Sequence, residues 1–81
     1  MAPSEAWRRE GEALVRDDRF DDFAAAMAFV NRVAEAAEAA NHHPDILVHG
    51  WNNVRLTLTT HSVGALTQAD ERLAEVIDDL A

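Results

Sequence analysis

The chain has 81 residues, no cysteine and a formal net charge of −8, from 15 acidic residues against 7 arginines and no lysine. This length predicts a single domain over residues 1–81, and the acidic excess argues against nucleic acid as a direct ligand, because binding to phosphates needs clustered Lys or Arg. No apolar run approaches the roughly 20 residues of a membrane span, so we expect no membrane partner and a cytoplasmic location.

The first twenty residues predict two strands. Residues 7–9 indicate a short strand, and Gly11, between two glutamates, indicates the turn after it. Residues 12–20 indicate a second strand, although its central acidic residues are poor strand formers. One side of this strand would carry Leu14, Arg16, Asp18 and Phe20.

From Phe23 onward the apolar residues recur at helical spacing. One stripe consists of Phe23, Met27, Val30, Ala34 and Ala37, and an adjoining stripe of Phe29, Val33, Ala36 and Ala40. Asp21 or Asp22 is placed to cap the start of this helix. Pro44 favours an extended conformation before it, so the helix should end near Asn41. The two stripes suggest contact with a sheet on one side and with a partner chain on the other.

The second half of the chain predicts two more strands and a helix. Residues 46–51 indicate a strand, residues 52–53 a turn, and residues 54–60 a half-buried strand in which apolar and polar residues alternate. Thr67 and Asp70 have the spacing of a capping box, with Asp in place of the usual Glu. The apolar face of the last helix would consist of Leu73, Val76, Ile77 and Leu80.

The predicted order of elements is therefore strand, strand, helix, strand, strand, helix. Hairpins need only short turns, so the simplest arrangement is an α+β fold in which two helices pack on one face of a four-stranded antiparallel sheet.

The four histidines, which lie between positions 42 and 61, are the strongest candidates for chemistry. The sequence has no serine or cysteine in a nucleophile context and no glycine-rich phosphate loop. Imidazole has an unperturbed pKa of about 6.5 and can both donate and accept a proton near neutrality. The main chemical possibility is therefore a histidine acid–base site that uses no cofactor. A zinc site of three histidines that includes His61 is the alternative, but no ligand spacing supports it.

Each candidate residue also has a purely structural interpretation. His42 and His43 would lie where the first helix ends, and an imidazolium is favourable there. Adjacent side chains of an extended segment point to opposite sides, which argues against one metal ion bound by both. His61 can be an exposed residue at the end of a strand, and Asp70 can be a capping residue only.

Three other residues are open to two interpretations in the same way. Glu38 lies one helical turn before His42, so the two side chains should share a face, but Glu38 can also be a solvated helix charge. Trp51 is most simply a core or interface aromatic. His49 shows no partner pattern and is interpreted as a strand residue.

Taken together, these residues resemble the active-site pattern of the pterin-4a-carbinolamine dehydratases. The pattern consists of Glu38, His42, His43, Pro44, Trp51, His61 and Asp70. The surrounding segments FVNRVAEAAEAANHHPDI, WNNVRLTLTTHSVGALTQAD and RLAEVID are similar to this family as well, and the resemblance extends from Trp7 to the C-terminus. The chain departs from the family in three places: the family's N-terminal helix is absent or very short, Asp18 stands at a strand position that is more often apolar, and Gly64-Ala65 replaces Gly-Gly.

The resemblance implies that the protein removes water from 4a-hydroxytetrahydropterin to give quinonoid dihydropterin, in the recycling of tetrahydrobiopterin and without a cofactor. It implies that His42 and His61 transfer protons and that His43 binds or polarises the substrate. Which histidine is the acid and which is the base stays open. The residues expected to bind the pterin or to orient the imidazoles are Glu38, Pro44, Trp51 and Asp70.

The same family also contains non-enzymatic members, which provide the alternative function. Some act as dimerisation cofactors of a transcription factor, and others as assembly chaperones of a carbon-fixing enzyme. Whether the protein is an enzyme or an interaction module, we expect it to form a homodimer. The resemblance also allows a homotetramer. The domain is small, 16 of its 39 apolar residues are alanine, and the strand 54–60 would invite pairing if it lay at the edge of the sheet.

Overall fold

The computed structural model describes residues 3–81. In chain order the elements are β1 (Trp7–Glu10), β2 (Ala13–Arg19), α1 (Phe23–Ala40), β3 (Asp45–His49), β4 (Asn53–Leu58) and α2 (Gln68–Leu80). The order of strands and helices is the predicted one. Within residues 3–81, no helix is long and apolar enough to cross a membrane.

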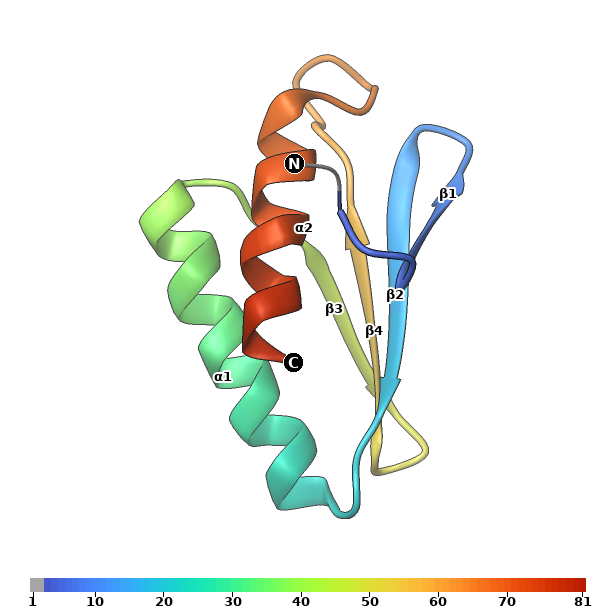
Figure 1. The fold of residues 1–81 in the computed structure, drawn as a ribbon, viewed down its shortest axis with the longest axis vertical. Coiled ribbons are helices and arrows are strands. Elements are labelled where there is room, and N and C mark those ends of the chain that lie inside the picture. The colour runs from blue at the N-terminus through green and yellow to red at the C-terminus, as the bar shows by residue number, and fades with distance from the viewer. Residues whose placement is uncertain (1–2) are drawn as a thin grey trace.

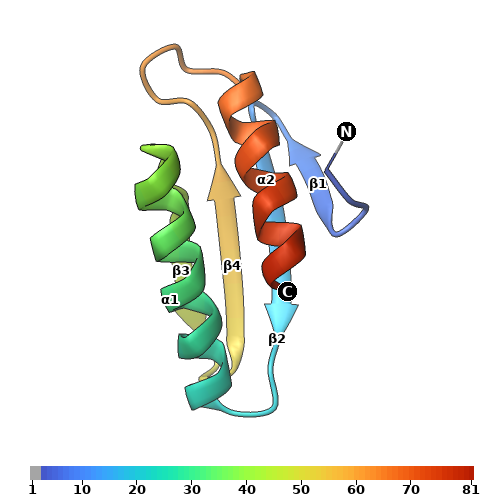
Figure 2. The same cartoon turned by 60° about the vertical axis from the view of Figure 1, so that its left-hand side comes forward.

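The four strands form one antiparallel sheet in the order β1-β2-β4-β3. Both helices pack on the same face of this sheet and run in opposite directions, and the other face is open (Figure 1, Figure 2). The predicted α+β fold is therefore confirmed. The strand 54–60, however, does not offer a free edge, because β4 is paired with β2 on one side and with β3 on the other.

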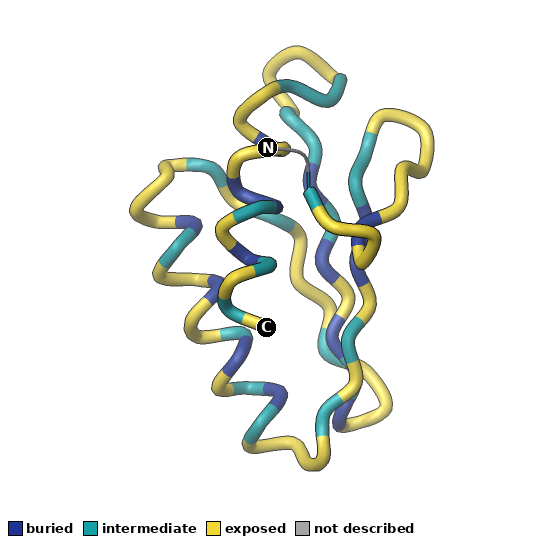
Figure 3. Tube along the Cα trace, in the orientation of Figure 1, coloured by how far each residue is buried: buried dark blue, intermediate teal, exposed yellow. Residues whose placement is uncertain are grey.

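The hydrophobic core lies between the helices and the sheet (Figure 3). Its buried residues are Trp7, Ala26, Phe29, Val33, Ala37, Val54, Leu56, Leu58, Leu73, Ala74 and Ile77. The alternation predicted for β4 is confirmed, since its three apolar side chains are buried and face the helices. Truncation of a fully buried leucine such as Leu56 to alanine typically costs about 2–5 kcal/mol.

The buried face of α1 follows the second predicted stripe at Phe29 and Val33, and it includes only Ala37 of the first stripe. Its buried residues are Ala26, Phe29, Val33 and Ala37. Phe23 and Ala34 of the first stripe are exposed, because at 100° per residue they fall outside the arc that meets the sheet. As the sequence indicated, Asp22 caps the start of the helix and the helix ends at Asn41. Asn41 has a left-handed conformation, which is common directly after a helix.

The β3–β4 hairpin turns earlier than predicted. β3 ends at His49, residues 50–52 form the turn, and Asn53 already belongs to β4. Trp51 lies in this turn with a positive φ of 57° and is 61 % exposed, so it is a turn residue and not a core aromatic. The strand prediction failed here because apolar composition alone does not show where a chain reverses direction.

Helix α2 begins with the predicted capping box. Thr67 is the N-cap, and its side chain and that of Asp70 bond reciprocally to backbone N–H groups. Leu73 and Ile77 face the core as expected, whereas Val76 is exposed. Ala74 takes the place in the core that the sequence assigned to Val76.

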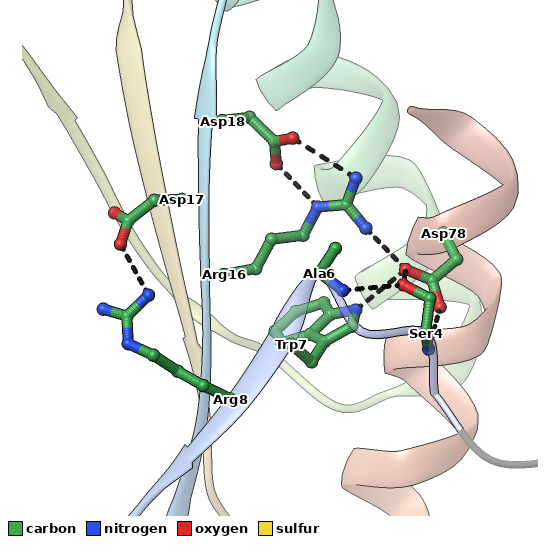
Figure 4. A network of polar contacts seen from close by, with 8 residues as sticks. All are labelled: Ser4, Ala6, Trp7, Arg8, Arg16, Asp17, Asp18 and Asp78. Atoms are coloured by element: carbon green, nitrogen blue, oxygen red, sulfur yellow. Dashed lines mark hydrogen bonds and ion pairs between the residues drawn. The ribbon is translucent and has the colours of Figure 1, made fainter.

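A buried polar network, which the sequence did not indicate, ties the start of the chain to α2 (Figure 4). Arg16, only 5 % exposed, bonds to Asp18 at 2.6 Å and to Asp78 at 2.5 Å. The carboxylate of Asp78 also accepts hydrogen bonds from the indole N–H of Trp7 at 3.1 Å and from the backbone and hydroxyl of Ser4 at 2.8 Å each. This network also explains why an acidic residue is tolerated at position 18.

Candidate active site

The candidate site lies at one end of the sheet, where three elements meet. Pairing of Asp45 with Thr57 brings the start of β3 beside the end of β4, so residues 42–44 lie near residues 59–61. The left-handed Asn41 makes this possible, because it reverses the chain after α1. The N-terminal end of α2 completes the site through Asp70.

His42 is paired with the buried carboxylate of Asp70. The Nε2 atom of His42 lies 2.5 Å from Oδ1 of Asp70. The Asp70 side chain is fully buried and that of His42 is 16 % exposed. The backbone N–H of His42 bonds to the carbonyl of Ala37 and so helps to close the end of α1, but its ring does not act as a helix cap. The ring is instead held by a residue 28 positions away.

Two threonines complete the surroundings of Asp70. Oδ2 of Asp70 accepts a hydrogen bond from the hydroxyl of Thr60 at 2.7 Å and one from the backbone N–H of Thr67 at 2.9 Å. Burial disfavours the charged form of Asp70, but the hydrogen bonds from His42, Thr60 and Thr67 outweigh burial and lower the pKa of this carboxyl below its usual range. Asp70 therefore serves both as a capping residue and as the partner of His42.

Glu38 contacts His43 and not His42, which corrects the expectation from helical spacing. The Nε2 atom of His43 forms a short hydrogen bond with the carboxylate of Glu38. The spacing rule fails because α1 ends before His42, so that positions 38 and 42 do not belong to one helical face. Both partners of this pair are exposed.

His61 lies just beyond the end of β4, in a tight loop. Thr60 pairs with Ala65 through a backbone hydrogen bond of 3.1 Å, and Gly64, with φ of 64°, allows the intervening residues to turn. The strand therefore stops at Leu58, two residues before the predicted end at position 60, and His61 belongs to the loop. The loop nevertheless brings His61 to the same pocket as the other two histidines.

That pocket has a volume of about 240 Å³ and contains three imidazoles in its wall. It is lined by Asn41, His42, His43, Thr59, Thr60, His61 and Ser62. Pro44 follows directly after the two adjacent histidines and precedes β3. A site of this kind can donate a proton to one atom of a small ligand and remove a proton from another.

Two of the candidate residues lie away from the pocket. Trp51 and His49 are at the turn end of the β3–β4 hairpin, and the histidine pocket is at its opposite end. Within one chain, Trp51 is therefore not placed to bind a ligand of this pocket. Among residues 3–81, no three His or carboxylate side chains are arranged to hold a metal ion.

A second hollow, of about 440 Å³, lies between α1 and α2 and is bordered by His42 on one side. Alanines, Leu73 and Val76 provide most of its wall, and Arg72 is its charged residue. Since it contains a single imidazole, it cannot supply an acid and a base together. The pocket with three histidines is the better candidate for chemistry, although it is the smaller of the two.

Comparison with known proteins agrees with this geometry. The sequence model of the family described as pterin 4 alpha carbinolamine dehydratase matches residues 1–80. The chain belongs to the pterin-4a-carbinolamine dehydratase family. A protein of Thermomicrobium roseum, provisionally named a pterin-4-alpha-carbinolamine dehydratase, is 55 % identical over 75 residues, covering 93 % of this chain and 80 % of that protein. A protein of Thermosynechococcus vestitus with the same provisional name is 46 % identical over 81 residues, covering 100 % of this chain and 84 % of that protein.

Solved structures of dehydratase-family proteins share the fold. The crystal structure of a transcriptional coactivator/pterin dehydratase from Brucella melitensis superposes with a TM-score of 0.88 at 33 % identity, covering 95 % of this chain and 83 % of that one. A pterin dehydratase-like protein, described as a RuBisCO assembly factor in the alpha-carboxysome, superposes with a TM-score of 0.78 at 28 % identity and covers 95 % and 90 % of the two chains.

Proposed function

We propose that this member of the dehydratase family removes water from 4a-hydroxytetrahydropterin to give quinonoid dihydropterin, by acid–base catalysis on its histidines and without a cofactor. The observation that carries the proposal is the pocket lined by His42, His43 and His61, in which His42 is held by the buried Asp70. A pathway that recycles tetrahydrobiopterin in the cytoplasm is the setting in which such an activity would be used.

The reaction needs two proton transfers. The hydroxyl on C4a must be protonated to leave as water, and the hydrogen on N5 must be removed as the C4a–N5 double bond forms. One imidazole that acts as acid and one that acts as base provide both proton transfers. Each typically increases the reaction rate by about 10²–10⁴-fold. We assign the two proton transfers to His42 and His61, and the binding or polarisation of the substrate to His43.

The supporting residues act on the histidines. Asp70 orients His42 through the 2.5 Å hydrogen bond, and Glu38 does the same for the more exposed His43. Pro44 restricts the backbone directly after His43 and helps to aim the two rings.

A dehydration assay tests this proposal. The purified protein is mixed with freshly generated 4a-hydroxytetrahydropterin, and the formation of quinonoid dihydropterin is followed by absorbance. We expect the rate to exceed that of the buffer reaction in proportion to the protein concentration. A rate that equals the buffer reaction at every protein concentration would refute the activity.

The alternative function is that of an interaction module, as in an assembly factor or a transcriptional cofactor. It is favoured by the similarity to the RuBisCO assembly factor. Such a module does not require three imidazoles around one pocket or a buried carboxylate behind one of them. A protein that lacks dehydratase activity but has this fold would support the alternative.

We further propose that the protein forms a homodimer through the free edge of β3. Among residues 3–81, no strand pairs with its outer side, and Ile46 and Leu47 are 37 % and 53 % exposed. An exposed edge strand with apolar side chains favours pairing with another chain. A small domain gains stability when association with a second copy buries such apolar side chains.

The sequence of β3 is complementary to itself when it runs antiparallel to a second copy. If Leu47 of one copy faces Leu47 of the other, each Asp45 faces a His49, which forms two pairs of favourable charge once the imidazoles are protonated. In the same register, Trp51 of one copy would approach His43 of the second copy. Trp51 would then contribute to the pocket of its partner, although it is remote from the pocket of its own chain.

A further inference from the structure

Two threonine hydroxyls, one bonded to the carboxylate of Asp70 and the other bonded to the first, have no part in the reaction proposed above. Thr60 follows β4 and directly precedes His61, and Thr67 is the N-cap of α2. Their hydroxyl oxygens lie 2.7 Å apart, and Thr60 lies 2.7 Å from Oδ2 of Asp70. Together they form a short chain of hydrogen bonds that ends on the carboxylate.

The direction of each hydrogen bond in this chain follows from the number of protons available. A hydroxyl has one proton to donate. Thr60 donates its proton to Asp70, so between the two threonines Thr67 must donate and Thr60 must accept. The oxygen of Thr67 in turn accepts from the backbone N–H of Ala69 at 3.3 Å. All hydrogen bonds of this chain therefore point toward Asp70.

The carboxylate of Asp70 consequently meets donors only. Oδ2 receives the Thr60 hydroxyl and the Thr67 backbone N–H, and neither of these can accept a proton from it. An ionised carboxylate has no proton to donate, so its contact with His42 requires that Nε2 of His42 carries the proton. A neutral His42 then has its unprotonated nitrogen at Nδ1.

We propose that Thr60 is a positioning residue, which holds Asp70 as a hydrogen-bond acceptor, fixes neutral His42 as the Nε2–H tautomer and so makes Nδ1 the atom that accepts the substrate proton. The assignment of Nδ1 to proton transfer rests on the proposed function, whereas the tautomer does not. The same threonine precedes His61, so the residue that fixes the state of one histidine also belongs to the segment that carries the other. In the described part of the chain, His42 is the titratable group in contact with Asp70, and its other partners, Thr60 and Thr67, are uncharged.

The tautomer can be measured without any substrate. Two-bond ¹H–¹⁵N correlation spectra of the ¹⁵N-labelled protein, recorded at a pH where His42 is neutral, distinguish a protonated from an unprotonated ring nitrogen. We expect Nε2 of His42 to be protonated and Nδ1 to be unprotonated in the wild-type protein. A wild-type spectrum with the proton on Nδ1 would overturn the proposal, and this test requires no variant to fold.

Thr60→Val removes the hydroxyl at nearly constant shape, and Thr60→Ser retains it. Thr57→Val is the matched control, because it makes the same change in β4 at a position whose partners are Val15 and Asp45. In Thr60→Val we expect the ¹⁵N chemical shifts of both His42 ring nitrogens to move toward values averaged between the two tautomers. We also expect the Asp70 carboxyl to titrate at a higher pH in a ¹³C experiment. Thr60→Ser and Thr57→Val should retain the wild-type spectra.

Activity provides the second readout. Thr60→Val should lower the dehydration rate by about tenfold, which is less than the roughly 10²-fold expected for loss of a general acid or base, and Thr60→Ser should restore it. A Thr60→Val protein with wild-type ¹⁵N shifts would overturn the positioning role, whatever its activity. A wild-type protein that shows the expected tautomer but no dehydration would refute the proposed function and leave the tautomer assignment supported.

Discussion

Removal of the Asp78 carboxylate should destabilise the fold more than removal of an exposed carboxylate that also contacts arginines, such as that of Asp17. Asp78→Ala leaves Arg16 with Asp18 as its remaining partner and leaves the indole N–H of Trp7 without its acceptor. Each buried donor without a partner costs about 1–3 kcal/mol. The donors of Ser4 are exposed and can bind water instead.

The expected loss is about 2–4 kcal/mol, because Asp18 still neutralises Arg16 and water can partly replace a carboxylate whose side chain is 17 % exposed. A domain of this length typically has a free energy of unfolding of about 4–12 kcal/mol. The variant should thus lose a large part of its stability. Urea denaturation at pH 7, followed by circular dichroism at one protein concentration, measures the difference.

Asp17→Ala is the matched control for this experiment. Asp17 also contacts two arginines, Arg8 and Arg55, but this network lies on the open face of the sheet and its side chains are exposed. Exposed ion pairs contribute little, so Asp17→Ala should lower the free energy of unfolding by a small fraction of the loss in Asp78→Ala. Equal losses in the two variants would refute the argument that burial gives the Asp78 network its strength.

The pH dependence provides a second check on Asp78. Burial raises the pKa of this carboxyl, but the hydrogen bonds from Ser4 and Trp7 and the charge of Arg16 outweigh it and lower the pKa below the usual 3.8. The carboxylate therefore stabilises the fold fully above pH 3.8, and this contribution is lost as the pH falls toward the folded-state pKa. The difference in stability between wild type and Asp78→Ala should accordingly be largest above pH 3.8 and shrink at lower pH.

Three further predictions concern the site and the assembly. Asp70→Glu retains the charge but adds a methylene in a fully buried position, so the circular dichroism spectrum should remain that of a folded protein while the dehydration rate falls at least tenfold; full activity would restrict Asp70 to its capping role. Dehydration should be insensitive to EDTA, and a rate abolished by the chelator and restored by zinc would replace acid–base catalysis by a metal site. Light scattering at micromolar concentration should give twice the 8.9 kDa mass of one chain, and Leu47→Lys should shift it toward the monomer; a stable, active wild-type monomer contradicts the dimer.

The sequence predicted the fold because its signals are local. Helix α1 is bounded by a capping aspartate and by Asn41 before Pro44, and the capping box of Thr67 and Asp70 marks the start of α2. The alternation in β4 identified its buried face. These signals depend on neighbours within a few residues, which a sequence displays directly.

The contacts within the site could not be predicted in the same way, because they join distant positions. His42 is 28 residues from Asp70, and Arg16 is 62 residues from Asp78, so no spacing indicates either pair. Glu38 was assigned to the wrong histidine because the end of α1 interrupts the helical period. Thr60 was not singled out at all, since a threonine at the end of a β-strand is common and its role becomes visible only beside Asp70.

The most direct test of the central claim is the dehydration rate of three histidine variants, measured with 4a-hydroxytetrahydropterin under conditions where light scattering shows the same assembly for all. His42→Ala and His61→Ala each remove an imidazole from the pocket and should lower the rate by roughly 10²-fold or more. His49→Ala removes an exposed imidazole at the opposite end of the β3–β4 hairpin and should retain nearly the wild-type rate. A loss in His49→Ala as large as that in His61→Ala, or wild-type rates in both His42→Ala and His61→Ala, would contradict the assignment of catalysis to this pocket.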